Sequence, residues 1–289
     1  MVLTARDWLA SEELGNRFDD VRLLRAGSRF TIYEGRETQA HRTVVIKVPD
    51  DHSASWLHDV LDHEAAVLSA ISSHPHVITL FQRVQLDDGR PALLLEHCDH
   101  SLADTLRDGD RMSLQSAIST GIKLAGALET LHHAGFLHCD VRPSNILVSE
   151  WGEPLLAGFD ESVHIGSATG RAPLHVTTAH TALELLEGQE PTVRSDVYGL
   201  ASTLYELVAG RAAFGAYVGE SPATVIVRVL SGRVKPIVAP DVPLEISDLL
   251  TWGMSADPAR RPPSPAWIAE ELGRMERRQG WPRTRMISG

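Results

Sequence analysis

The residues best suited to chemistry lie in one stretch, between positions 138 and 160. It reads HCDVRPSNILVSEWGEPLLAGFD, with Asp140 two residues after His138 and Asn145 five residues after the aspartate. An aspartate can accept a proton once it lies within hydrogen-bond reach of the group that loses it, and Mg²⁺ takes oxygen ligands. The apolar run after Asn145 ends in a Gly-Phe-Asp triplet, which adds a second carboxylate. Asp140 can equally be a turn or capping residue, so these residues alone leave both interpretations open.

Strand-like segments and one helix come before this stretch. Residues 18–27, 29–37 and 42–49 are short β-rich runs separated by turn residues, which predicts an antiparallel meander. Residues 53–72 repeat apolar side chains at three- and four-residue spacing, which predicts an amphipathic helix. Two further strands are expected in 76–85 and 91–98.

After residue 98 the pattern becomes helical. A long helix with one apolar stripe is predicted over 113–134, and the helix at 195–209 is apolar nearly all round, which is typical of a buried helix. Shorter helices are predicted at 101–109, 222–231, 244–254 and 266–278. The arginine-rich end of the chain predicts a solvated tail, and the alternative is a segment that holds an acidic partner.

Composition narrows the class of protein. Of the 289 residues, 43% are hydrophobic and 22% charged, which indicates a globular protein. The net charge of −11 argues against nucleic acid as a partner. Cys98 and Cys139 are too few for a disulfide framework. No signal-peptide pattern and no long apolar run is visible, so we expect a cytoplasmic protein that does not enter the membrane.

Seven motifs occur in an order that resembles the protein kinase family, and most closely its bacterial Hanks-type serine/threonine members. The segment 138–145 resembles the catalytic loop H-R-D-x-x-x-x-N, in the P-x-N form of serine/threonine kinases. The other six are VVIK at 44–47, Glu64 on the following helix, LLEHC at 94–98, ALE at 182–184, SDVYGLASTLYELVAG at 195–210 and DPARRP at 257–262.

This resemblance implies an α+β, bilobal protein-kinase-like fold over residues 18–275. A β-rich N-lobe with one helix would span 18–97, and a helical C-lobe would span 98–275. Residues 1–17 would form a flanking helix and 276–289 a basic tail. The resemblance also implies a stack of side chains that joins the lobes, made of Leu68, Leu80, His138 and Phe159 and anchored by Asp196, and a buried ion pair of Glu184 with Arg261.

The resemblance assigns roles to the reactive residues. Lys47 would hold the ATP phosphates and Glu64 would hold Lys47, whereas Asp140 would accept the proton of the substrate hydroxyl. Arg142 replaces the usual lysine, and Asn145 would bind Mg²⁺. The alternative interpretation of Lys47 and Glu64 is structural: Lys47 would be an exposed lysine at the end of a strand, and Glu64 an unrelated glutamate on a helix face. The expected nucleotide-binding residues are Gly27, Ile32, Val45, Lys47, Glu96, Cys98 and Leu147.

The phosphate-binding loop and the adenine pocket depart from the family. The pattern G-x-G-x-x-G becomes residues 25–30, RAGSRF, in which only Gly27 survives. Glycines there let backbone N–H groups approach phosphate. Arg25 and Phe30 should hold the loop away or fill the space beneath it, although an arginine of this loop could instead contact phosphate. Val45 replaces alanine and narrows the adenine pocket.

The triplet at 158–160 is the third departure. Gly158 lies 13 residues after Asn145, where the family has its metal-binding aspartate. If Asp160 were that aspartate, Glu161 would enter the apolar stack, and an unpaired carboxylate there is costly. Gly158 therefore takes the metal position, and Asp160 is left as a candidate ligand from a neighbouring position.

A fourth departure concerns regulation. Cys139 replaces the arginine that binds a phosphorylated activation loop. Threonines are present between Gly158 and Glu184, at positions 169, 177, 178 and 181. Cys139 is expected to be a buried thiol, with a reactive cysteine as the alternative. Three histidines, His132, His133 and His138, are close in sequence, but we expect structural roles for them and not a metal site.

These features predict a pseudokinase, a kinase-fold regulatory or scaffold module. It would act on a protein partner, bind ATP weakly and have little use for Mg²⁺. An active but atypical serine/threonine kinase that phosphorylates a protein hydroxyl is the alternative, and a small-molecule kinase is a remote third hypothesis. The oligomeric state cannot be predicted from the sequence.

Overall fold

The computed structural model describes residues 17–50, 55–86, 89–107, 110–166, 179–215 and 220–289. The predicted flanking helix lies outside these residues. The chain divides into two compact units. The first contains the residues up to 73 together with 78–98, and the second contains 74–77 and 99–289.

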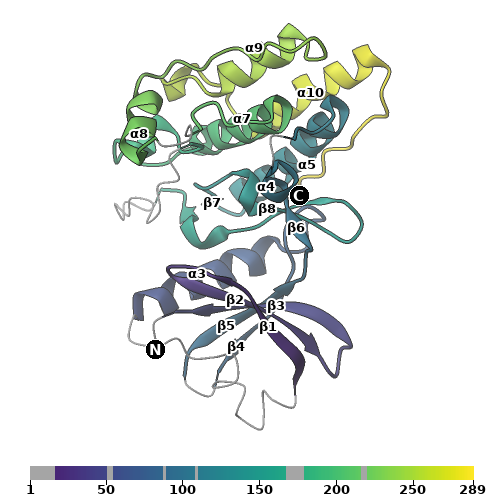
Figure 1. The fold of residues 1–289 in the computed structure, drawn as a ribbon, viewed down its shortest axis with the longest axis vertical. Helices are drawn as coiled ribbons and strands as arrows, with labels where there is room; N and C mark the ends of the chain where they lie inside the picture. Colours follow the sequence, from purple (N-terminus) through teal and green to yellow (C-terminus); the bar gives the residue numbers. More distant parts are fainter. Residues whose placement is uncertain (1–16, 51–54, 87–88, 108–109, 167–178, 216–219) are drawn as a thin grey trace. The chain divides into compact units, whose positions relative to one another are not determined.

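The first unit is a five-stranded antiparallel sheet with one helix, as predicted (Figure 1). The strand order is β1-β2-β3-β5-β4. The elements are β1 (Phe18–Ala26), β2 (Phe30–Glu37), β3 (Arg42–Pro49), α3 (Ser55–Ile71), β4 (Leu80–Gln85) and β5 (Pro91–Glu96). Val44, Ile46 and Val48 of β3 belong to the core on one face of the sheet. The alternation of a strand therefore turns Val45 and Lys47 to the other face.

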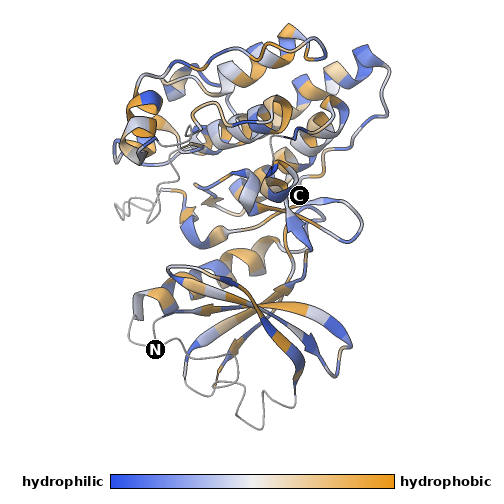
Figure 2. Cartoon of the chain, in the orientation of Figure 1, coloured by the Kyte–Doolittle hydropathy of each residue, from blue (hydrophilic) through white to orange (hydrophobic). Residues whose placement is uncertain are grey.

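The second unit is mainly helical. The long helices α5 (Leu114–His133), α7 (Val193–Ala209), α9 (Leu244–Gly253) and α10 (Pro265–Gln279) pack together, with α5 against both α7 and α10. Shorter helices are α4 (Leu102–Thr105), α6 (Leu183–Leu186) and α8 (Pro222–Leu230). As Figure 2 shows, hydrophobic and hydrophilic residues alternate around these helices. No helix among the described residues is both long and apolar enough to cross a bilayer.

Short strands in the second unit lie within and beside residues 138–160, the stretch that carries Asp140 and Asn145. One sheet contains β6 (His100–Ser101), β8 (Ile146–Val148) and β9 (Pro154–Leu156), and a second pairs β7 (Phe136–Leu137) with β10 (Val163–His164). Two 3₁₀ turns, η2 (Pro143–Asn145) and η3 (Phe159–Glu161), lie within residues 138–161, and a third, η4 (Pro258–Arg260), contacts α7. Strands of two or three residues are too short to show a period in the sequence, so they were not predicted.

Two predictions differ in detail from the structure. The strand expected from residue 76 begins only at Leu80, because the carbonyl of His76 accepts a hydrogen bond from the Leu156 amide at 2.9 Å and Val77 bridges to Leu156. The arginine-rich tail is mostly exposed, as a solvated tail would be, but it also makes defined contacts with the second unit. Thr284 donates to the Glu276 carboxylate, and the ring of His74 contacts the Ile287 carbonyl at 2.8 Å.

Candidate functional site

Lys47 and Glu64 form a buried ion pair in the first unit. Lys47 Nζ lies 2.6 Å from Glu64 Oε2, and the two residues are 8% and 2% exposed. Strand β3 directs Lys47 to the face that α3 covers, and Glu64 lies on the buried side of α3. A buried charge is stable only when it is paired. The pair therefore fixes the ammonium group at one position on the sheet.

Phe30 occupies the neighbourhood of this ammonium group. Its ring centroid lies 4.5 Å from Lys47 Nζ, which is within the range of a cation–π contact. Phe30 is only 7% exposed, whereas Arg25 is exposed on β1. The prediction that Phe30 fills space beneath the loop agrees with this geometry.

Gly27 has a structural role that differs from the predicted one. Its amide donates to the carbonyl of Phe30 at 3.1 Å, which closes the turn between β1 and β2. A Cβ at position 27 would lie 2.6 Å from that same oxygen, closer than real Cβ contacts. The tight turn therefore requires glycine, so Gly27 by itself is no evidence of a phosphate-binding loop.

The other predicted nucleotide-binding residues divide between the two units. Ile32 pairs with Lys47 across the β2–β3 ladder and so shares a face with it and with Val45. Glu96 lies at the end of β5, where its carboxylate accepts hydrogen bonds from the amide and hydroxyl of Thr79. Cys98 ends the first unit and is half-buried. Leu147 belongs to β8 of the second unit.

The loop that carries Asp140 is held by buried polar groups. Asp196 of α7 accepts hydrogen bonds from the amides of His138 at 2.9 Å and Cys139 at 2.8 Å. His138 accepts from the Asp140 amide through Nδ1 and donates to the Ala157 carbonyl through Nε2. Burial lowers the pKa of His138, so the ring is neutral and each nitrogen has one partner. The ring also packs 4.8 Å from that of Phe159, and both residues are fully buried.

Asp140, Arg142 and Asn145 are brought together at the end of this loop. The Asn145 amide donates to the Asp140 carbonyl at 2.9 Å and to its carboxylate at 2.7 Å. Arg142 Nε lies 2.9 Å from Asp140 Oδ2, without the alignment of a hydrogen bond. Burial raises the pKa of Asp140, and the charge of Arg142 opposes this rise. A carboxylate with a raised pKa is a better proton acceptor than an ordinary aspartate.

Gly158 provides no ligand beside these residues. Its backbone is left-handed, with φ of 77° and ψ of 53°. A Cβ built there would lie 2.7 Å from Asn145 Cγ and 2.9 Å from each of its amide atoms. The Asn145 side chain therefore occupies the space into which a residue at 158 would project.

Asp160 lies in η3 and affects the loop that carries Asp140 through its charge. Its negative charge raises the pKa of Asp140, so the two carboxylates interact through space. Mg²⁺ binds in proteins through one or two carboxylates together with substrate phosphates. Asp140, Asp160 and the Asn145 carbonyl oxygen are therefore the groups of this unit that could hold a metal ion. No group of three or more histidine, cysteine, aspartate or glutamate side chains suited to a metal occurs among the described residues.

The neighbouring histidines have separate partners. His132 Nε2 contacts Asp196 at 2.7 Å, and His133 Nδ1 contacts the Glu129 carbonyl at 2.7 Å. His132 thus completes the set of groups around Asp196, a role that the sequence reasoning missed. Its position near the end of a helix gives no signal of this contact, because the partner lies 64 residues away.

Cys139 is expected to be unreactive in the folded protein. Burial raises the pKa of its thiol well above the ordinary value, and Asp196 adds to this effect, so no thiolate forms at neutral pH. We predict that iodoacetamide at pH 8 leaves Cys139 unmodified in the native protein and alkylates it in 8 M urea. Peptide mass spectrometry measures this, and the urea-treated sample is the control. Rapid native labelling of Cys139 would contradict it.

Sequence comparison with known proteins identifies a family that matches the fold and the loop described above. The protein kinase domain family model matches residues 18–272. The chain therefore belongs to the protein kinase family, among the bacterial Hanks-type serine/threonine kinases. It is 33% identical over 275 residues to the serine/threonine-protein kinase PknK of Mycobacterium tuberculosis, a match that covers 94% of this chain and 25% of PknK.

Two other relatives are less similar. The serine/threonine-protein kinase PknJ of Mycobacterium tuberculosis is 29% identical over 254 residues, covering 83% of this chain and 42% of PknJ. The serine/threonine-protein kinase PkaB of Streptomyces coelicolor is 28% identical over 262 residues, covering 87% of this chain and 61% of PkaB. The chain thus spans between a quarter and about three fifths of these proteins.

Proposed function

We propose that the chain is a pseudokinase-like regulatory module, which binds nucleotide weakly and with little dependence on Mg²⁺ and acts through a protein partner. Gly158 is the observation that carries this proposal. The family uses ATP and Mg²⁺, but position 158 has no carboxylate, and Asn145 fills the space beside it. The Phe30 ring at Lys47 supports the same conclusion, because phosphate would have to compete with this cation–π contact.

The test is a calorimetric titration of the protein with a non-hydrolysable ATP analogue, with and without Mg²⁺. We expect Mg²⁺ to change the affinity by less than about threefold, because one charge-assisted contact is typically worth tenfold or more. Lys47→Met is the control and should weaken binding in both conditions. An increase of about tenfold or more with Mg²⁺ would overturn the proposal.

An active, atypical serine/threonine kinase is the second candidate. It is favoured by the electrostatic interaction of Asp160 with Asp140 and by the Lys47–Glu64 pair. A phosphotransfer assay on a generic protein substrate discriminates the two candidates. If wild-type protein incorporates phosphate and both Asp140→Asn and Asp160→Asn abolish incorporation, the chain is a kinase in which Asp160 binds the metal. The matches to serine/threonine protein kinases disfavour a small-molecule substrate.

A further inference from the structure

A cavity of about 700 Å³ lies between α10 and the last residues of the chain. It lies wholly within the second unit and uses none of the residues discussed above as a candidate site. Its volume is within the range of small-molecule sites in proteins.

Small residues of α10 create this space. Ala266, Ala269 and Gly273 recur on one side of the helix at three- and four-residue spacing and line the cavity. Ile122 of α5 and Met286 of the tail add further apolar surface. The cavity therefore has an apolar floor.

The opposite wall is a fixed segment of the chain, Trp281–Gly289, which we call the C-terminal strap. Figure 1 shows it running back from the end of α10 toward α5. The Glu276 carboxylate, in a residue only 1% exposed, accepts from the amide of Thr284 at 2.9 Å and from its hydroxyl at 2.6 Å. A Cβ on Gly126 of α5 would lie 2.1 Å from the Ile287 carbonyl oxygen, so glycine there lets the strap touch the helix. These contacts form the cavity before any ligand arrives.

Arginines give the cavity a strong positive charge. Arg277 of α10 and Arg283 and Arg285 of the strap line it, and none of their side chains has an ion pair or hydrogen bond with any residue that the structure describes. The other two charged lining residues, Glu270 and Arg274, lie 3.8 Å apart and offset each other. Three guanidinium groups thus line the cavity without an ion-pair partner among the described residues, on a chain whose net charge is −11.

We propose that this cavity binds a small organic dianion that carries a phosphate or two carboxylates on an apolar body. Guanidinium groups recognise phosphate and carboxylate oxygens with paired hydrogen bonds. Three of them favour a ligand with at least two negative charges, and the apolar floor accepts its carbon skeleton. This inference goes beyond the proposed function and does not depend on it.

Ligand-observed NMR titration tests this site with phenyl phosphate, phthalate and benzyl alcohol as probes. We expect the two dianions to bind and the neutral alcohol not to bind, and their relative affinities to show whether phosphate or carboxylate is preferred. The double variant Arg277→Gln/Arg283→Gln should weaken dianion binding by about tenfold or more, as lost charge-assisted hydrogen bonds require. Raising the salt concentration should weaken it further.

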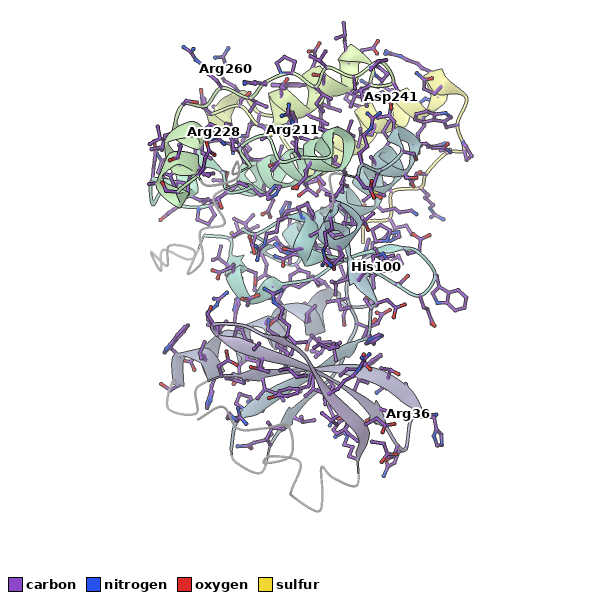
Figure 3. The ribbon with its side chains drawn as sticks, in the orientation of Figure 1. Arg36, His100, Arg211, Arg228, Asp241 and Arg260 are labelled. Atoms are coloured by element: carbon purple, nitrogen blue, oxygen red, sulfur yellow. The ribbon has the colours of Figure 1, made fainter. Side chains whose placement is uncertain are left out.

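A second variant blocks the cavity and leaves its charges in place. A Cβ at Gly273 meets only Arg277 Nη1, at an ordinary 3.7 Å, so Gly273→Leu should cover the apolar floor of the cavity without lowering the melting temperature and should abolish binding. The matched control is Arg211→Gln/Arg233→Gln, which removes two exposed arginines outside the cavity and should bind as wild type does; Arg211, labelled in Figure 3, follows α7. Lys47→Met should also bind normally, which separates this site from nucleotide binding. The proposal is overturned if neither dianion binds below about 10 mM, or if Gly273→Leu or Arg277→Gln/Arg283→Gln binds as the control does.

Discussion

Gly158→Asp is expected to give the protein Mg²⁺-dependent ATP binding, with the affinity for the nucleotide in Mg²⁺ rising about 10- to 100-fold. The substitution places a carboxylate where the family holds its metal ion. Asp140 and Asn145 already lie next to this position, so the added charge would complete a set of oxygen ligands. Calorimetric titration with an ATP analogue, with and without Mg²⁺, measures the effect.

The backbone should tolerate this aspartate. The left-handed conformation at 158 is uncommon for residues other than glycine, but aspartate and asparagine adopt it more readily than most. The new Cβ must displace the Asn145 side-chain amide, because the present separations of 2.7–2.9 Å are closer than real Cβ contacts. A stability cost of about 1–2 kcal/mol is expected from this adjustment, and it should leave the protein folded.

Gly158→Asn is the matched control. Asparagine has nearly the same shape and the same tolerance for left-handed backbone, but it has no charge. It should carry the same stability cost without the gain in Mg²⁺-dependent affinity. If both variants gain affinity equally, charge at 158 is not what the wild-type protein lacks. If neither gains, the missing aspartate does not account for the proposed weak binding, and Phe30 becomes the main obstacle.

The sequence predicts contacts that depend on residue type and regular spacing. Lys47 and Glu64 could be paired in advance only through the resemblance to the kinase family, because a strand lysine and a helix glutamate alone also fit two unconnected residues. Glu184 and Arg261 could be paired from motifs 77 residues apart, and their oxygens and nitrogens lie 2.7 Å apart as expected.

Contacts that depend on close approach of backbone could not be predicted. Gly27 looks like a remnant of a phosphate loop, yet a turn that brings it to the Phe30 carbonyl accounts for it. Gly126 looks like an ordinary helix residue, yet it makes room for Ile287. In both cases the folded chain brings a backbone carbonyl oxygen so close to the glycine that no Cβ would fit. Neither hydrophobic period nor motif spacing carries that information.

Arg261→Met is expected to destabilise the protein by about 3–5 kcal/mol, the usual result of removing one partner of a buried ion pair. Arg261 is 2% exposed and makes two 2.7 Å hydrogen bonds with Glu184. It also donates to the carbonyls of Ser255 and Arg194, and its guanidinium lies 4.9 Å from the Tyr198 ring centroid. Methionine keeps much of the volume but leaves the Glu184 carboxylate buried, with the Ser195 hydroxyl as its remaining donor. Urea denaturation at 25 °C measures the change in the free energy of unfolding.

Two further variants show that the unpaired charge causes this loss. Arg274→Met removes an exposed arginine that pairs with Glu270 and Glu271 on the surface, and it should cost less than about 1 kcal/mol. Glu184→Leu/Arg261→Met removes both buried charges, and it should recover part of the stability that Arg261→Met loses, because an apolar pair of similar volume often replaces a buried ion pair without penalty. If the double variant is instead less stable than Arg261→Met, the hydrogen bond that Ser195 donates to Glu184 contributes more than the buried charge of Glu184 costs. The pair would then brace α6 and α7 mainly through hydrogen bonds, and its charge would be secondary.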